Sequence, residues 1–167
     1  NRLVISLAGE PELVQSALIE AAKEAVKRID LNRHQGEHPR IGAVDVIPFT
    51  PLQNMTMEEC VSLAKTFGRR YQAETGVPVY YYEEAAVRPE RRRLEVVRKG
   101  QFEALQEEIR RPERHPDVGE PHLHPTAGAT AVGARKFLVA FNVNLGTTDV
   151  DVARRIVDAV RASTGGL

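Results

Sequence analysis

Apolar residues recur at two spacings along the chain, and the spacing separates the expected strands from the expected helices. Short runs of β-branched and aromatic residues bounded by turn-forming residues predict strands. Longer stretches with an apolar residue every three or four positions predict helices, because such residues share one helix face. Strands are therefore expected over residues 3–7, 44–49, 77–82 and 136–145, the last having the strongest pattern.

The first two expected helices have clear start and stop signals. Pro11 suits a first helical turn, where no amide donor is needed, and a helical pattern over residues 11–30 follows it. Thr56 and Glu59 spell a capping box, and Gly76 suits a helix C-terminus, so a second helix is expected between them. The apolar face expected for the first helix comprises Val14, Ala17, Leu18, Ala21, Ala25 and Ile29.

Two more helical stretches follow, separated by a long polar loop. Residues 89–109 predict a helix in two pieces, broken near Gly100. Residues 111–128 hold four prolines and three of the five histidines, which predicts a loop. The alternation of helices and strands predicts an α/β domain with helices packed on one face of a sheet. The last helix is expected over residues 149–162, with a buried side of Val152, Ile156, Val157 and Val160.

Length and charge set further limits. The chain has 167 residues, enough for one domain with its own core, and it is 42% hydrophobic. Lys plus Arg equals Asp plus Glu at 23 each, so no net charge attracts nucleic acid or an anionic membrane. No apolar run approaches the ~18–20 residues that cross a bilayer, and no signal peptide is visible. The mixed-sign cluster of Arg88, Arg91, Arg92 and Arg93 predicts a solvated face.

Cys60, the single cysteine, excludes an internal disulfide and fits a reducing cytoplasm. Its place on the apolar face of the second expected helix predicts a packed core thiol rather than a nucleophile.

Residues 34–40 read HQGEHPR, which contains the His-x-x-Glu-His spelling of an inverted zinc-protease motif. That motif needs a helix, because residues four apart must share a face. Gly36 weakens a helix by about 1 kcal/mol relative to alanine, and Pro39 biases the residue before it toward an extended backbone. A loop without metal is therefore expected. His122 and His124, flanked by prolines, form a second apparent ligand pair that is interpreted as solvated loop histidines.

A plain surface loop is the simplest interpretation of residues 34–40, but three features favour chemistry. The ordinary pKa of histidine lies near physiological pH, which suits the side chain to proton transfer. Pro39, with Gly36 and Gly42 on either side, restricts the backbone and could hold an imidazole in one direction. The loop also leads into the strand expected at 44–49, and loops at strand ends commonly carry function.

Several stretches together resemble the glutamate formiminotransferase family. They are HQGEHPRIGAVDVIPF with MEEC downstream, VPVYYYEEAA, HPTAGATAVGARKFLVAFNVNL and the closing STGGL. The resemblance spans essentially the whole chain. It implies transfer of a formimino group from N-formimidoyl-L-glutamate to N5 of tetrahydrofolate, giving 5-formimidoyltetrahydrofolate and L-glutamate in histidine degradation.

The resemblance also implies a fold and a site. The fold is a ferredoxin-like N-terminal subdomain covering residues 1–167, without its leading strand, helix and strand. His38 is the implied general acid/base, and tetrahydrofolate is the co-substrate, with no metal. Implied partners are the small-molecule substrates, a C-terminal subdomain of the same protein, and further copies in a cytoplasmic homo-oligomer. The implied folate-binding residues are Gly119, Glu120, Pro121, His122, Leu123, His124, Pro125, Thr126, Ala127 and Gly128.

Alternatives to this interpretation stay open at the level of sequence. The transferred group could be formyl rather than formimino, since the two differ only in NH versus O. The chain could also belong to a non-catalytic folate-binding homologue. Arg40 and Arg135 suit substrate carboxylates by charge and fork geometry, and equally suit surface ion pairs.

Overall fold

The computed structural model describes residues 2–138 and 143–160. Two compact units divide the chain, Asn1–Phe137 and Leu138–Leu167. Within the described residues, no helix combines the length and the apolar character that crossing a membrane requires.

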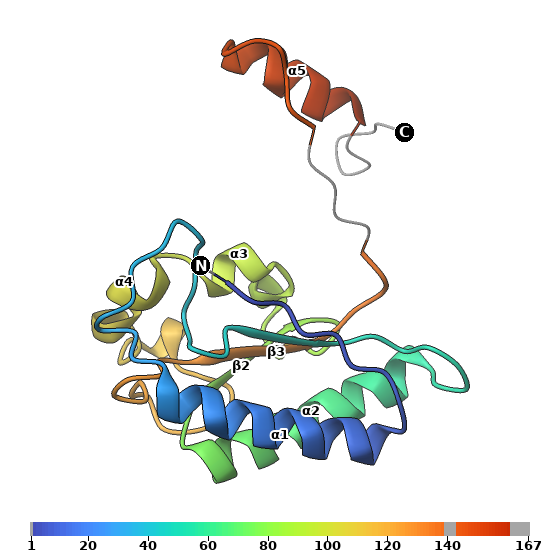
Figure 1. The fold of residues 1–167 in the computed structure, drawn as a ribbon, viewed down its shortest axis with the longest axis vertical. Helices are drawn as coiled ribbons and strands as arrows, with labels where there is room; N and C mark the ends of the chain where they lie inside the picture. The colour runs from blue at the N-terminus through green and yellow to red at the C-terminus, as the bar shows by residue number, and fades with distance from the viewer. Residues whose placement is uncertain (1, 139–142, 161–167) are drawn as a thin grey trace. The chain divides into compact units, whose positions relative to one another are not determined.

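A parallel sheet of three strands organises the first unit (Figure 1). The strands are β1 (Val46–Phe49), β2 (Val79–Glu83) and β3 (Thr130–Ala134), in the order β1-β3-β2. The register places Val132 of β3 between Ile47 of β1 and Tyr81 of β2. Strands were expected where β1 and β2 form, at residues 44–49 and 77–82. Pro48 lies in β1, an edge strand, which suits a residue without an amide donor.

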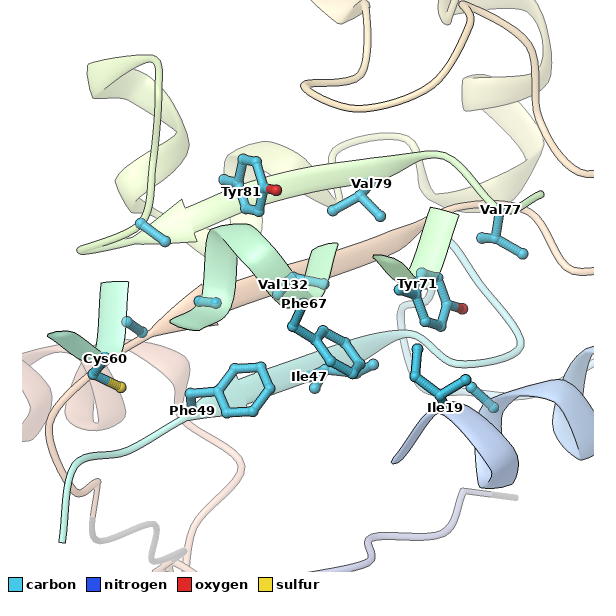
Figure 2. Close-up of a cluster of buried hydrophobic side chains, with 14 of the residues drawn as sticks. Ile19, Ile47, Phe49, Cys60, Phe67, Tyr71, Val77, Val79, Tyr81 and Val132 are labelled. Atoms are coloured by element: carbon cyan, nitrogen blue, oxygen red, sulfur yellow. The ribbon is translucent and has the colours of Figure 1, made fainter. Parts of the chain in front are cut away.

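One face of the sheet packs against α1 (Pro11–Arg28) and α2 (Met57–Thr75), as Figure 1 shows. The core between these layers contains Phe67 and Tyr71 of α2 and Phe49 of β1 (Figure 2). The rings of Phe49 and Phe67 meet edge-on with centroids 5.1 Å apart. Cys60 is fully buried in the same core, which confirms the packed thiol, and this burial raises its pKa.

The opposite face is covered as well, which differs from the expected single helical layer. α3 (Leu94–Val97) and α4 (Gln101–Glu108) lie there, with the 3₁₀ turns η1 (Pro89–Arg92) and η2 (Pro112–Arg114) beside them. Side chains alternate along β2, so Tyr81 faces α2 while Tyr80 and Tyr82 face the α3–α4 side. The α/β class is confirmed. The β-α-β-β-α-β order of a ferredoxin-like unit is not seen in the described strands, and that finer name stays a prediction.

The local signals for the first two helices are confirmed. The Thr56 hydroxyl accepts a hydrogen bond from the Glu59 amide at 3.2 Å, and the Glu59 carboxylate accepts one from the Thr56 amide at 2.7 Å. Gly76 ends α2 with a left-handed φ of 71°. The buried face of α1 is rotated from the expected one. Ala17 and Ala21 are exposed, and the fully buried positions are Gln15, Ile19 and Ala22.

Two expected strands do not form in the described residues. Residues 3–7 pair with no described strand, and Leu3 and Val4 are 81% and 78% exposed. Of residues 136–145, positions 139–142 lie outside the described residues, and 136–138 and 143–145 are not strand. The β-rich composition of residues 3–7 is insufficient, because a strand also needs a neighbouring strand and none of the described strands pairs with them.

In the second unit, α5 (Val150–Val160) confirms the last expected helix, although residues 161–162 lie outside the described residues. The side expected to be buried is not. Val152 is half-buried, while Ile156, Val157 and Val160 are 43%, 41% and 51% exposed. An amphipathic pattern marks a helix face that can be covered, but burial depends on an element that packs against it.

Arg91 corrects the expected solvated arginine face. Its side chain is buried and forms an ion pair with the buried carboxylate of Asp117 at 2.8 Å. It also donates hydrogen bonds to the carbonyl oxygens of Glu113 and His115, and it lies over the ring of Tyr80. By contrast, Arg92 and Arg93 are exposed, as expected, and Arg88 is half-buried.

Candidate functional site

The segment over residues 31–42 consists of turns and bends, which confirms the loop expected for HQGEHPR. The helix face that the zinc-protease motif needs is therefore missing. Within residues 2–138 and 143–160, no group of three or more His, Cys, Asp or Glu side chains is placed to hold a metal ion. The expectation that no metal takes part stays a prediction.

Arg40 fastens this loop to the start of α4. Its guanidinium makes a fork of two hydrogen bonds to the Glu103 carboxylate, at 2.7 and 2.9 Å. The Arg40 carbonyl accepts a hydrogen bond from the Phe102 amide at 2.9 Å. The same guanidinium donates back to the His34 carbonyl at 3.3 Å. Of the two roles open for Arg40, the structure shows the ion pair. The hydrogen bonds that Arg40 donates lower the pKa of Glu103.

His38 is half-buried, and one of its ring nitrogens is engaged. Nδ1 lies 2.8 Å from the carbonyl oxygen of Pro39. A carbonyl oxygen only accepts hydrogen bonds, so Nδ1 must carry the proton in this contact. In the neutral ring Nε2 is then the unprotonated nitrogen, with a lone pair that can take up a proton. The Pro39 carbonyl thus fixes the tautomer in which His38 can act as a base.

The loop expected to bind folate runs beside the loop that contains His38. The Leu31 amide donates to the Thr126 carbonyl at 2.8 Å, and the Ala43 amide donates to the Ala127 carbonyl at 2.9 Å. An isolated β-bridge joins Gly42 to Gly128. The structure therefore brings together two segments more than eighty residues apart in the sequence, a proximity that no local pattern could predict.

Two glycines permit this close approach. A Cβ on Gly128 would lie 2.2 Å from the Ile41 carbonyl oxygen, and one on Gly42 would lie 1.9 Å from the Ala129 carbonyl oxygen. Gly128 also has a φ of 70°, in the left-handed region that favours glycine. The juxtaposition of the two loops thus depends on the absence of a side chain at both positions.

His124 has the opposite tautomer to His38. Its Nδ1 accepts hydrogen bonds from the amides of Thr126 at 3.3 Å and Ala127 at 3.1 Å. A nitrogen that accepts cannot carry a proton, so Nε2 holds the hydrogen in the neutral ring. Burial lowers the pKa of His124, which favours this neutral form. His124 is therefore a donor at Nε2 and a brace for its own loop, and it is not the solvated histidine expected.

The expected folate-binding residues do not all gather at one place. His122, Leu123, His124 and Pro125 line a cavity of about 300 Å³, whose other wall is α4 and the two residues after it. We call this the α4 cavity, and its remaining lining residues are Asn32, Phe102, Gln106, Ile109 and Arg110.

Other expected site residues lie elsewhere. Gly119 lies against Gln72 of α2, where an added Cβ would come within 3.2 Å of that side chain. Glu120 is exposed, and its carbonyl accepts from the His122 amide. Arg135 lines neither the α4 cavity nor a second cavity beside Pro39, and its guanidinium donates to the Lys136 carbonyl at 3.3 Å.

A second cavity, of about 430 Å³, borders Pro39 and therefore lies next to His38 in the chain. Its other lining residues are Leu94 and Glu95 of α3, Arg98 just after α3, and Gln101, the first residue of α4. Gln101 has a φ of 58°, which is uncommon for a residue other than glycine. Sequence reasoning missed both the α4 wall and this start of α4. The helix break near Gly100 was the only signal at that position.

The sequence matches a known protein family over most of the chain. Residues 1–135 match the sequence model described as Formiminotransferase domain, N-terminal subdomain. The chain is 48% identical over 166 residues to a protein of Streptococcus pyogenes serotype M1 named glutamate formimidoyltransferase, and the match covers 99% of this chain and 56% of that protein. A protein of the same name from Thermoplasma acidophilum is 46% identical over 169 residues, covering 100% of this chain and 55% of that protein.

A longer relative carries the same region. The protein named formimidoyltransferase-cyclodeaminase from Gallus gallus is 48% identical over 166 residues, which cover 99% of this chain and 30% of that protein. The chain therefore spans about half the length of the two proteins named glutamate formimidoyltransferase, and less of the chicken protein. On the match of residues 1–135 and these identities, the chain belongs to the formiminotransferase domain family, in the part that forms its N-terminal subdomain.

Proposed function

We propose that the complete protein containing this chain transfers a formimino group from N-formimidoyl-L-glutamate to N5 of tetrahydrofolate. The products are 5-formimidoyltetrahydrofolate and L-glutamate, a step in histidine degradation. The names of the two relatives that cover this whole chain support the group transferred and its glutamate donor. The family resemblance of HQGEHPR and of the loop over residues 119–128 supports the folate acceptor.

The observation that carries the proposal is the fixed tautomer of His38, in a loop that lies beside the loop over residues 119–128. The attacking amine must lose a proton, and the glutamate nitrogen must gain one before the C–N bond breaks. His38 Nε2 accepts the first proton and donates it in the second step, while the Pro39 carbonyl keeps Nδ1 protonated throughout. General acid/base catalysis of this kind contributes about 10²–10⁴ in rate. The proposal uses no metal, because a protonated amidine carbon is already electrophilic.

Folate is proposed to bind along residues 119–128, next to the loop that carries His38. A flat ring with an amide edge suits backbone donors and acceptors at close range, with apolar side chains against its faces. Support comes from the α4 cavity, which this loop lines, and from the backbone bonds between residues 31–43 and 126–129 that hold the two loops side by side.

Replacing His38 in the full-length protein tests its role. His38→Asn should lower the kcat of formimino transfer by about 10²-fold or more, with folding unchanged, since one partly exposed contact is removed. The matched control is Glu37→Gln, which changes an exposed residue of the same loop that lines neither cavity. A near-normal kcat of formimino transfer in His38→Asn would refute the role of His38 as general acid and base.

Donor and assembly are tested separately. Turnover of N-formylglutamate in place of N-formimidoyl-L-glutamate would favour formyl transfer. Calorimetric folate binding without any transfer would favour a non-catalytic homologue. The proposal also includes a second subdomain and a homo-oligomer in the cytoplasm, and light scattering of the complete protein would measure that assembly.

A further inference from the structure

The α4 cavity has one fixed wall. The Asn32 side-chain amide donates to the Pro125 carbonyl at 2.9 Å, and Leu31 holds Thr126 through its amide. His124 braces the same loop through the two amides that its Nδ1 accepts. The loop that forms this wall is therefore held in place before any ligand arrives. A preformed wall lowers the entropy lost on binding.

The cavity offers one charged donor group, the Arg110 guanidinium, beside amide and imidazole groups that can donate as well as accept. Its apolar lining comes from Phe102, Ile109 and Leu123. The guanidinium of Arg110 and the amide of Gln106 have no hydrogen bond or ion pair to any residue that the structure describes, and the cavity contains no Asp or Glu. Donors without partners beside apolar surface match a ligand that brings negatively charged acceptors.

The neighbours of Arg110 behave differently. Arg111 and Arg114 both contact the Glu108 carboxylate, at 3.6 and 3.4 Å. Exposed arginines commonly take part in such pairs, and each contributes little to stability. Arg110 borders the cavity instead, although the same carboxylate is two residues away in sequence. Arg110 is exposed, and of these three arginines it alone lines the cavity.

We propose that the α4 cavity binds the carboxylate of a glutamate group, with Arg110 as its charged partner and Gln106 as a second donor. The inference rests on the proposed function, because both of its substrates carry such a carboxylate: the glutamate tail of tetrahydrofolate and N-formimidoyl-L-glutamate itself. Arginine suits this role because its planar fork matches the two oxygens of a carboxylate.

Substitution of Arg110 in the full-length protein tests the site and identifies the source of the carboxylate. Arg110→Gln should raise the KM of one glutamate-bearing substrate by roughly tenfold to a hundredfold, with little change in kcat, since hydrogen bonds to charged groups are of that strength. Arg110→Lys, which keeps the charge without the fork, should fall between. The matched control is Arg111→Gln, an adjacent arginine that does not line the cavity.

Three substrates separate the outcomes. If the cavity holds the folate tail, Arg110→Gln raises the KM of tetrahydrofolate but leaves that of tetrahydropteroate, which lacks the glutamate, unchanged. If it holds the donor, the KM of N-formimidoyl-L-glutamate rises instead. The inference is overturned if both KM values stay within about twofold of wild type, or if Arg111→Gln has the same effect as Arg110→Gln.

Calorimetry keeps this inference separate from the proposed function. Tetrahydrofolate and L-glutamate are titrated into wild type and Arg110→Gln, a measurement that needs no turnover. A wild-type protein that transfers nothing would refute the proposed function. Weaker binding of either compound by Arg110→Gln would still support the carboxylate site, and equal binding of both would refute it.

Discussion

Arg91→Ala should destabilise the protein far more than the same change at its neighbour Arg92. Arg91 and Asp117 form an ion pair in which both side chains are 5% exposed. The guanidinium also donates to the His115 carbonyl at 2.6 Å and to that of Glu113 at 3.2 Å. Truncation removes these partners together and leaves the Asp117 carboxylate in a buried place.

The magnitude follows from what remains after truncation. Asp117 keeps the hydrogen bond from the Tyr81 amide at 2.7 Å, but its charge loses its counter-ion. Breaking a buried pair in this way costs about 3–5 kcal/mol, against a total stability of about 5–15 kcal/mol for a typical domain. Arg92 pairs with Glu84 at the surface, where both side chains are largely exposed, and such pairs contribute about 0–1 kcal/mol.

Urea unfolding followed by circular dichroism measures both variants in the same protein. We expect the free energy of unfolding of Arg91→Ala to fall at least about 2 kcal/mol further than that of Arg92→Ala. Because Asp117 lies just before the loop over residues 119–128, loss of its ion pair should loosen the start of that loop, and the folate affinity that we propose for it should fall. Equal losses in the two variants would refute the argument that burial makes the Arg91 pair costly to break.

Three further outcomes are expected. Burial lowers the pKa of His124 from its usual 6.5 in the folded protein. The neutral His124 therefore contributes its full stability above pH 6.5, and this contribution is lost as the pH falls through the pKa of the folded state. In His124→Asn, the urea midpoint of unfolding should vary less with pH. Gly128→Ala should lower the free energy of unfolding by about 2 kcal/mol or more, because residue 128 has a φ of 70° and its new Cβ would lie 2.2 Å from a carbonyl oxygen. In the control Gly146→Ala the new Cβ meets nothing within 4 Å, so this change should be nearly neutral. Arg40→Lys keeps the charge but loses the fork to Glu103, so we expect kcat to fall roughly tenfold by steady-state kinetics.

Each of these has an outcome that would contradict it. An unchanged pH profile in His124→Asn would show that this imidazole contributes nothing to acid sensitivity. A Gly128→Ala protein as stable as Gly146→Ala would mean that the two loops can separate at no cost. A kcat of Arg40→Lys within twofold of the wild-type value would mean that the ion pair between Arg40 and Glu103 does not position His38.

Local chemistry determined much of this protein. The capping box of Thr56 and Glu59, the left-handed Gly76 and the helix break near Gly100 appear where the sequence predicts them, since each depends on residues within one turn. The same holds for the loop character of HQGEHPR, because Gly36 and Pro39 act on their own backbone. These signals were enough to exclude the helical zinc motif.

Partners distant in sequence decided the rest. The small residues of β3 (Thr130–Ala134) form the central strand because β1 and β2 flank them, whereas the β-rich residues 3–7 pair with no described strand. Arg91 is buried because Asp117 forms an ion pair with it. The loop at residues 122–125 lines a cavity because α4, distant in sequence, forms the other wall. Sequence periodicity reports which residues can be buried or paired, but the free energy of burial and pairing is realised only against a specific neighbour, and only the tertiary structure supplies it.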